Sequence, residues 1–235
     1  MHRYFESVFR GNERNQPHVF IFETNCTFEV NVRKTKLKTM KTNSVIRQEA
    51  RAAMANNWGA GVVVTIVYSL ITSVVSALGY GILAIFVTFP LALGLVMTYL
   101  GLVRDGKALE VSSIFSGFKS PLYWKSVGVY LLSTIYTVLW TLLLIVPGII
   151  KGLAYGLAPY IMLDDPELTA EQAICKSMKM MDGHKMQLFV MILGMIVLSM
   201  LSGILLFIPL LWLVPYYQTI LAKFYEEVKA EQTQE

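Results

Sequence analysis

The sequence predicts an all-α membrane protein: a polytopic bundle of about six spans in three hairpins, each hairpin preceded by a short interfacial amphipathic helix. Three observations support this fold class. The mean hydropathy is +0.54, and only 15% of the 235 residues are charged, whereas a soluble domain carries about a quarter. Three long stretches are almost free of charge, and each has turn-forming residues near its middle. Lysines and arginines gather outside these stretches.

Each stretch is long enough for two membrane-spanning helices. Residues 52–103 and 186–222 contain no Asp, Glu, Lys or Arg, and residues 126–163 contain only Lys151. A helix needs about 20 apolar residues to cross about 30 Å of hydrocarbon. Glycines and prolines near the middle of each stretch divide it into a hairpin. The expected spans are 58–78, 82–103, 126–146, 149–163, 186–207 and 210–224. Whether the short fourth segment crosses completely stays open.

A short amphipathic segment precedes each hairpin, which suggests a threefold repeat of helix plus hairpin. Such helices can lie in the membrane interface with the apolar side toward the lipid. Before the third hairpin, Thr169 and Gln172 have the spacing of a capping box, which predicts where that helix begins. The apolar positions of the three segments are Ile46, Ala50, Ala53 and Met54, then Val111, Ile114, Phe115 and Phe118, then Ala170, Ile174, Met178 and Met181.

The basic residues predict the orientation. Beyond residue 39, twelve lysines and arginines lie before, between and after the hairpins, whereas the hairpin tips carry only Lys151. The positive-inside rule places the basic side in the cytoplasm. We therefore expect a multi-pass protein of the cell (inner, cytoplasmic) membrane with both termini cytoplasmic.

Residues 1–39 do not belong to this pattern. They lack the apolar core of a signal peptide, and Met40 precedes Lys41, Thr42 and a plausible helix cap. We expect residues 1–39 to be a mis-called or disordered N-terminal extension and residues 40–235 to form a single integral-membrane domain.

Catalytic signatures are missing from the sequence. The three histidines are His2, His18 and His184, and there is no His-Glu-x-x-His, G-x-S-x-G, P-loop or G-x-G-x-x-G motif. We therefore expect no enzyme activity, no catalytic residue, no metal site and no cofactor. The basic residues do not cluster as a nucleic-acid interface requires.

Glycines and a few polar residues near the fourth span are the candidate functional positions. Gly148, Gly152 and Gly156 are spaced one turn apart, which favours close helix packing over a ligand groove. Lys151 within a span is a candidate by position, although a lysine near a helix end can extend to water. Five residues are candidate ligand or lipid contacts: Lys151, Tyr155, Tyr160, Asp164 and Lys185. Ser133, Thr134, Thr137 and Thr141 fit either a polar path or ordinary helix–helix hydrogen bonding.

The chain resembles an uncharacterised bacterial integral-membrane family, a domain of unknown function. It is distantly similar to the membrane domain that accompanies some glycerophosphoryl diester phosphodiesterases. The resemblance covers about residues 43–228 and implies a multi-span cell-membrane protein without a known activity. After Phe189 the sequence lacks the family's serine and tryptophan. The matching residues are Pro147 to Lys151, Tyr155, Ala158 to Tyr160, Asp164, Pro166 to Leu168, Ala173, Ile174, Ser177, Met181, Gly183 to Lys185, Phe189, Leu211 to Tyr216 and Phe224 to Glu226.

Two functions remain in competition. The first is a non-enzymatic role in lipid handling or membrane support, with membrane lipids as partners. The alternative is a small-solute transporter or channel, with Lys151 and Tyr155 lining a path that opens at Pro147-Gly148. A homo-oligomer or a membrane-protein partner is compatible with the glycine pattern, and no nucleic-acid partner is expected.

Overall fold

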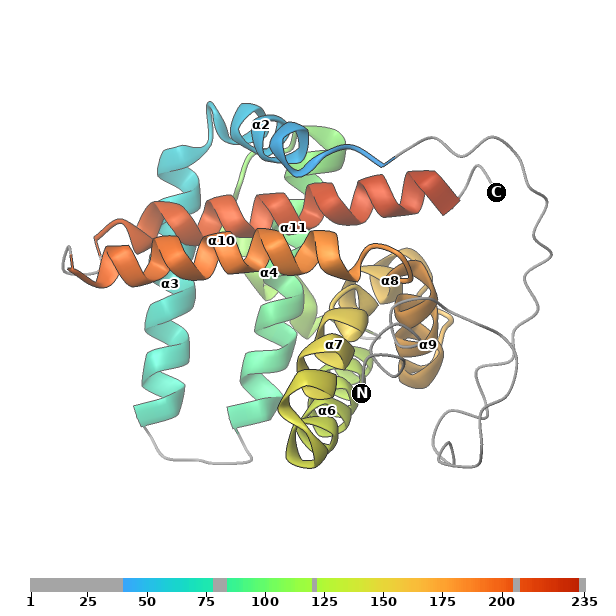
Figure 1. The fold of residues 1–235 in the computed structure, drawn as a ribbon. Coiled ribbons are helices and arrows are strands. Elements are labelled where there is room, and N and C mark those ends of the chain that lie inside the picture. Colours follow the sequence, from blue (N-terminus) through green and yellow to red (C-terminus); the bar gives the residue numbers. More distant parts are fainter. Residues whose placement is uncertain (1–39, 78–83, 120–121, 205–207, 233–235) are drawn as a thin grey trace, which may run out of the picture.

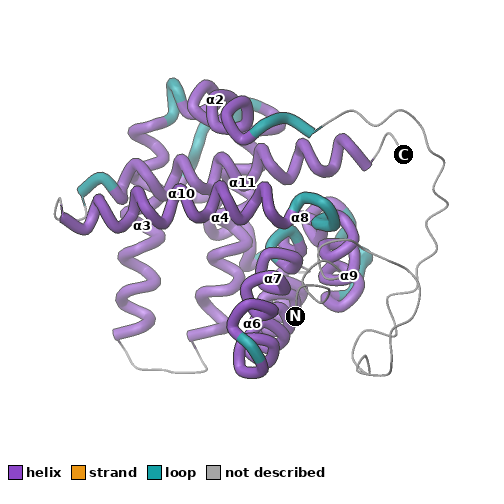
Figure 2. The backbone as a smooth tube through the Cα atoms, viewed as in Figure 1, coloured by secondary structure: helices purple, strands orange, loops and turns teal. Residues whose placement is uncertain are grey.

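The computed structural model describes residues 40–77, 84–119, 122–204 and 208–232. The described residues form helices joined by short loops and include no strand (Figure 2). The predicted all-α class is confirmed. The prediction for residues 1–39 lies outside the described residues. The helices are α2 (Asn43–Met54), α3 (Trp58–Ala77), α4 (Ile85–Asp105), α5 (Val111–Ile114), the 3-10 helix η2 (Phe115–Phe118), α6 (Leu122–Leu143), α7 (Ile145–Tyr155), α8 (Ala158–Asp164), α9 (Ala170–Met180), α10 (Lys185–Ile204) and α11 (Leu210–Gln232).

Five segments of the described chain are long and apolar enough to cross a membrane. They are α3, α4, α6, α7 together with α8, and α10 up to Ser202. These segments correspond to the first five expected spans. The sixth expected span, 210–224, lies in α11, which is not among the five. The chain is therefore a membrane protein by the length and composition of its helices.

All three short segments predicted before the hairpins are helical: α2, α5 with η2, and α9. The predicted start of α9 is confirmed in detail. The Gln172 backbone N–H donates to the Thr169 hydroxyl (3.3 Å), and the Thr169 N–H donates to the Gln172 side chain (2.9 Å). The buried residues of α9 are Ala173, Ile174, Ser177 and Met180.

Helix α5 and η2 lie along α4, whereas the sequence places this segment at the membrane interface. A Cβ atom built on Gly94 would lie 1.7 Å from the Ile114 carbonyl oxygen. One built on Gly117 would lie 1.9 Å from the Pro90 carbonyl oxygen. The Tyr123 hydroxyl then donates to the Phe86 carbonyl oxygen (3.2 Å). The chain after α4 therefore returns along α4 toward the end where that helix begins.

Helices α10 and α11 lie side by side across α3 and α4 (Figure 1). Helix α11 contacts α2, α3, α4, α9 and α10, and α10 contacts α7 and α11. The largest fully buried side chains in this region include Ile46 and Met54 of α2, Tyr99 of α4, and Phe224 and Tyr225 of α11. Part of the buried core therefore lies where α2, α4 and α11 meet.

Candidate functional site

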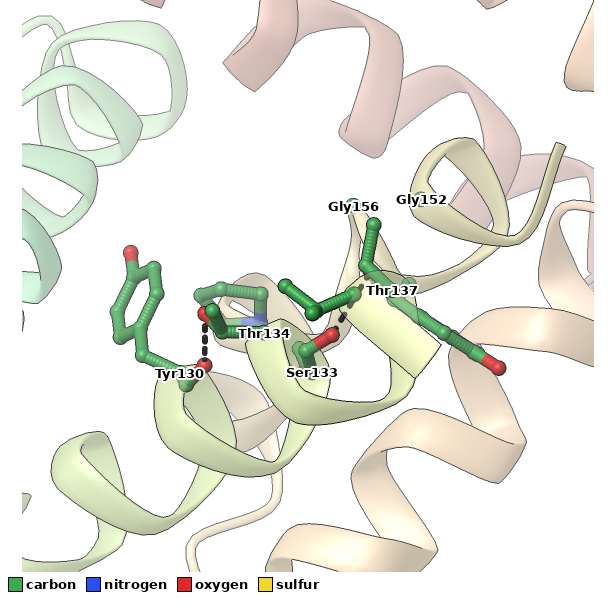
Figure 3. Close-up of a pocket in the computed structure, with 9 residues that line it drawn as sticks. Tyr130, Ser133, Thr134, Thr137, Gly152 and Gly156 are labelled. Carbon is green, nitrogen blue, oxygen red and sulfur yellow. Dashed lines mark hydrogen bonds between the residues drawn. The ribbon is translucent and has the colours of Figure 1, made fainter. Parts of the chain in front are cut away.

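A groove of about 360 Å³ opens between α6 and α7 (Figure 3). Gly152 and Gly156 are on its α7 side, and four of the labelled residues come from α6. Among the residues that line it, none carries a charged side chain. The lining residues are Tyr130, Ser133, Thr134, Thr137, Val138, Gly152, Tyr155, Gly156 and Pro159.

The glycines of α7 bring its backbone close to α6. A Cβ on Gly148 would lie 2.2 Å from Thr141 Oγ1 and 2.6 Å from Thr141 Cα, so no larger residue fits there. At Gly152, a Cβ would lie 3.3 Å from Thr137 Cγ2. Gly156 is different, because the nearest atom to its Cβ would be the Leu153 carbonyl oxygen of its own helix at 3.3 Å. Close packing and the groove therefore share one helix face.

The threonine hydroxyls beside the groove donate to their own helix. Thr134 Oγ1 donates to the Tyr130 carbonyl (2.7 Å) and Thr137 Oγ1 to the Ser133 carbonyl (2.8 Å). Thr141 Oγ1 does the same to Thr137 (2.7 Å). Such bonds to the preceding turn use the hydroxyl proton. These side chains consequently offer methyl groups and acceptor oxygens, but no free donor, to a ligand.

Two of the predicted contact residues lie at the α6–α7 interface. The Lys151 ammonium lies over the Trp140 ring, 5.2 Å from its centroid. The Tyr155 ring lies 6.2 Å from that of Tyr136, and Tyr155 also lines the groove. A cation over an indole face is favourable when both are shielded from water. Lys151 and Tyr155 therefore face the same helix, at successive turns of α7.

Ser177 of α9 holds the break between α7 and α8. Its hydroxyl donates to the Ala154 carbonyl oxygen (2.6 Å) and accepts from the Leu157 N–H (3.2 Å). The side chain is completely buried. The helix hydrogen-bond pattern is interrupted here, because α7 ends at Tyr155 and α8 begins only at Ala158. The serine supplies the partners that the interrupted backbone lacks.

Removing this hydroxyl is expected to destabilise the fold. In Ser177→Ala, the buried Leu157 N–H loses its acceptor, which costs about 1–3 kcal/mol. The thermal midpoint in detergent should fall by several degrees, since about 1 kcal/mol shifts a chain of this size by about 2–4 °C. Ser112→Ala is the control, because that hydroxyl is exposed and bonds only to Glu110. Equal midpoints for the two variants would contradict the bridging role.

A second polar site joins the ends of α4, α8 and α11 around Asp164. Arg104 donates to both carboxylate oxygens (2.7 and 2.9 Å), and Lys229 Nζ donates to one of them (2.6 Å). The Tyr225 hydroxyl donates to the same oxygen (2.5 Å). Arg104 also pairs with Glu226 (2.6 Å). Two cations and two carboxylates thus balance one another.

Aromatic rings cover this ion-pair cluster on one side. Tyr160 is buried and stacks on Tyr225, with ring centroids 5.1 Å apart. The Arg104 guanidinium carbon lies 5.9 Å from the Tyr225 ring centroid. Burial and the Asp164 carboxylate both raise the pKa of Tyr225 above its ordinary value of 10.0. The phenol therefore stays protonated and keeps donating to Asp164 at any physiological pH.

Lys185, the last predicted contact residue, lies apart from both sites. Its ammonium pairs with Asp182 at 3.5 Å. The preceding residue, His184, lies 3.4 Å from a Glu231 carboxylate oxygen at the end of α11.

The structure thus separates the five predicted contact residues into three places. Tyr155 and Lys151 lie at the groove side of α7, Tyr160 and Asp164 belong to the ion-pair cluster, and Lys185 lies at the start of α10. Sequence reasoning missed Arg104, Tyr225 and Lys229 as partners of Asp164. Their only signal was charge at the ends of apolar helices, which does not show which ends meet. No group of three His, Cys, Asp or Glu residues among the described ones can hold a metal ion.

The comparisons with known proteins agree with a family of unknown activity. The family described as "Protein of unknown function (DUF975)" matches residues 142–232. The matched part runs from the end of α6 to the end of α11 and contains Ser177, Asp164 and Tyr225. No curated protein and no solved structure matches the chain. The expected resemblance to an uncharacterised family is supported over these residues. The similarity to the phosphodiesterase-associated membrane domain stays a prediction.

Proposed function

We propose that the chain is a multi-pass protein of the cell (inner, cytoplasmic) membrane that binds a membrane lipid without catalysing a reaction. Both termini lie in the cytoplasm, and an acyl chain of the lipid occupies the groove between α6 and α7. One observation carries this proposal. The groove lies between two apolar helices, and its threonine hydroxyls already donate to their own backbone.

The size and lining of the groove suit an acyl chain. Its volume of about 360 Å³ falls in the range of pockets that hold small ligands. Methyl groups of Thr134 and Thr137, the Val138 side chain and the Tyr130 ring are exposed to a bound chain. The hydroxyls of Thr134 and Thr137 already donate to backbone carbonyls, so contact with hydrocarbon leaves neither of these two donors without a partner.

A small polar solute or an ion fits this groove less well. Transport sites within membranes use ionisable side chains or unwound backbone to replace the water lost from the solute. The lining residues are uncharged, and the hydroxyls of the two lining threonines donate to backbone carbonyls of their own helix. The lipid therefore remains the better ligand on chemical grounds.

Filling the groove should release the lipid. Val138 and Val63 are both 50% exposed, but only Val138 lines the groove. We expect the purified wild-type chain and Val63→Trp to retain one lipid per chain in native mass spectrometry after delipidation. Val138→Trp should retain at least about tenfold less, which corresponds to about 1.4 kcal/mol of binding free energy.

The same experiment distinguishes the alternatives. Equal retention by Val138→Trp and Val63→Trp would place the lipid elsewhere. A wild-type chain that retains no lipid would contradict lipid binding, and proteoliposome flux with Lys151→Ala would then test the transporter. Thermal midpoints of both variants should agree with that of the wild type, which confirms that the comparison concerns folded protein.

A further inference from the structure

The first and the last parts of helix α11 both lie at one end of the α3–α4 pair, where α3 begins and α4 ends. Near its start, Tyr216 lies against Trp58, the first residue of α3, with ring centroids 6.2 Å apart. Pro215 Cβ lies 3.0 Å from the position of a Cβ on Gly61, in the first turn of α3. Near its end, Glu226 pairs with Arg104 in the last turn of α4. The start of α3 and the end of α4 lie on the same side of the molecule (Figure 1).

Helix α10 remains on this side as well. Asn43 Nδ2 of α2 donates to the Gln187 carbonyl (3.3 Å), and Gln187 Nε2 donates to the Lys41 carbonyl (2.8 Å). Two turns further along α10, an Arg47 guanidinium nitrogen lies 2.9 Å from the position of a Cβ on Gly194. Side chains of α2 therefore contact α10 at two points along the first half of its length. Helix α10 does not follow α3 toward the opposite end.

The two faces of α10 differ in what covers them. Leu188, Met191 and Met195 are buried on one face, where α7 and α11 pack. The opposite face is an uncovered apolar stripe at helical spacing, which we call the α10 stripe. Its residues are Met186, Val190, Leu193, Val197, Met200 and Leu201.

We propose that α10 and α11 form a hairpin that lies in the plane of the membrane, on the side of α2, and that the α10 stripe is immersed in the acyl layer of that leaflet. A continuous stripe of six exposed apolar side chains requires an apolar cover, because contact between such a patch and water is unfavourable. The lipid is the cover because α10 packs against α7, whose exposed side chains Ile145, Val146 and Ile149 are also apolar. Arg47 of α2 lies beside α10, where it can meet the headgroups. Helix α11 packs against α2, α3 and α4, and its Glu226, Glu227 and Lys229 form ion pairs with α4, the segment before α2 and α8.

Depth measurements along α10 test the proposal. A nitroxide-bearing noncanonical residue is placed singly at Val190, Leu193, Val197 or Leu201 of the full chain in liposomes. Relaxation by oxygen and by a water-soluble nickel complex then reports the depth of each label. For an in-plane helix we expect four similar depths. In a spanning helix the first and last labels would differ by about 16 Å, because each residue rises 1.5 Å, and that gradient would overturn the proposal.

A labelling experiment on the loop before α11 gives an independent readout. An azide-bearing residue at Ile208, at Asn56 beside α2, or at Ala77 at the far end of α3 is treated with a membrane-impermeant dye in sealed, oriented vesicles. All three positions are exposed. Ile208 should react from the same side as Asn56. Reaction from the side of Ala77 would mean that α10 crosses the membrane, and the proposal would fail. If Ile208 lies too deep to react from either side, the depth profile decides.

Discussion

Replacing Gly94 by alanine is expected to disrupt the fold more than any other single methyl group added to this protein. The new Cβ would lie 1.7 Å from the Ile114 carbonyl oxygen and 2.5 Å from the Ile114 carbonyl carbon. Both neighbours are backbone atoms, so no side chain can rotate away. The α5–η2 segment must separate from α4, and overpacking of this kind costs about 3 kcal/mol. We expect the thermal midpoint in detergent to fall by about 10 °C.

Gly59→Ala is the matched control and should change stability in the opposite direction. Both glycines are in helices, but nothing lies within 4 Å of a Cβ on Gly59. Alanine is favoured over glycine in a helix by about 0.5–1 kcal/mol, so the midpoint should stay constant or rise slightly. Similar midpoints for the two variants would show that α5 and η2 do not contact α4 as the structure places them.

The second large effect is expected from Asp164→Asn. This carboxylate binds Arg104, Lys229 and the Tyr225 hydroxyl, and its side chain is only 13% exposed. Removing one partner of a buried ion pair costs about 3–5 kcal/mol. Because Arg104 and Lys229 are 28% and 42% exposed, solvent screens part of the loss, and we expect about 3 kcal/mol at most.

The adjacent Asp165 provides the control. It pairs with Lys176, and both side chains are nearly half exposed. Surface pairs of this kind contribute about 0–1 kcal/mol, so Asp165→Asn should melt close to the wild type. Thermal unfolding followed by tryptophan fluorescence measures both variants. If the thermal midpoints of the two variants differ by less than about 2 °C, the ion-pair cluster does not stabilise the fold.

Much of the fold can be predicted from local sequence patterns. Apolar length determined the five helices able to cross a membrane, and the Thr169–Gln172 spacing determined the start of α9. These features are predictable because the hydrogen bonds of a helix and its caps join residues three or four positions apart. The glycine steps of α7 pointed to a packed face for the same reason, since their spacing of one turn is visible in the chain.

The candidate sites were predictable only in part. Tyr160 and Asp164 attracted attention because they end an apolar segment, but their partner Arg104 lies 60 positions from Asp164. The threonines of α6 fitted two roles equally well in sequence. Only the three-dimensional structure shows that the hydroxyls of Thr134 and Thr137 donate to the preceding turn and that both residues line the groove between α6 and α7.

The sequence by itself determined that this protein is helical, apolar enough for a membrane, and divided into hairpins with short helices before them. Tertiary structure alone decided how these elements meet: η2 against Pro90, α11 against the ends of α3 and α4, and α10 beside α2. The physical reason is that burial of apolar surface has no direction. A few contacts between residues that are distant in the sequence select which helices pair. Examples are two glycines that allow another backbone to approach, and one carboxylate between two cations. No local sequence pattern encodes such contacts.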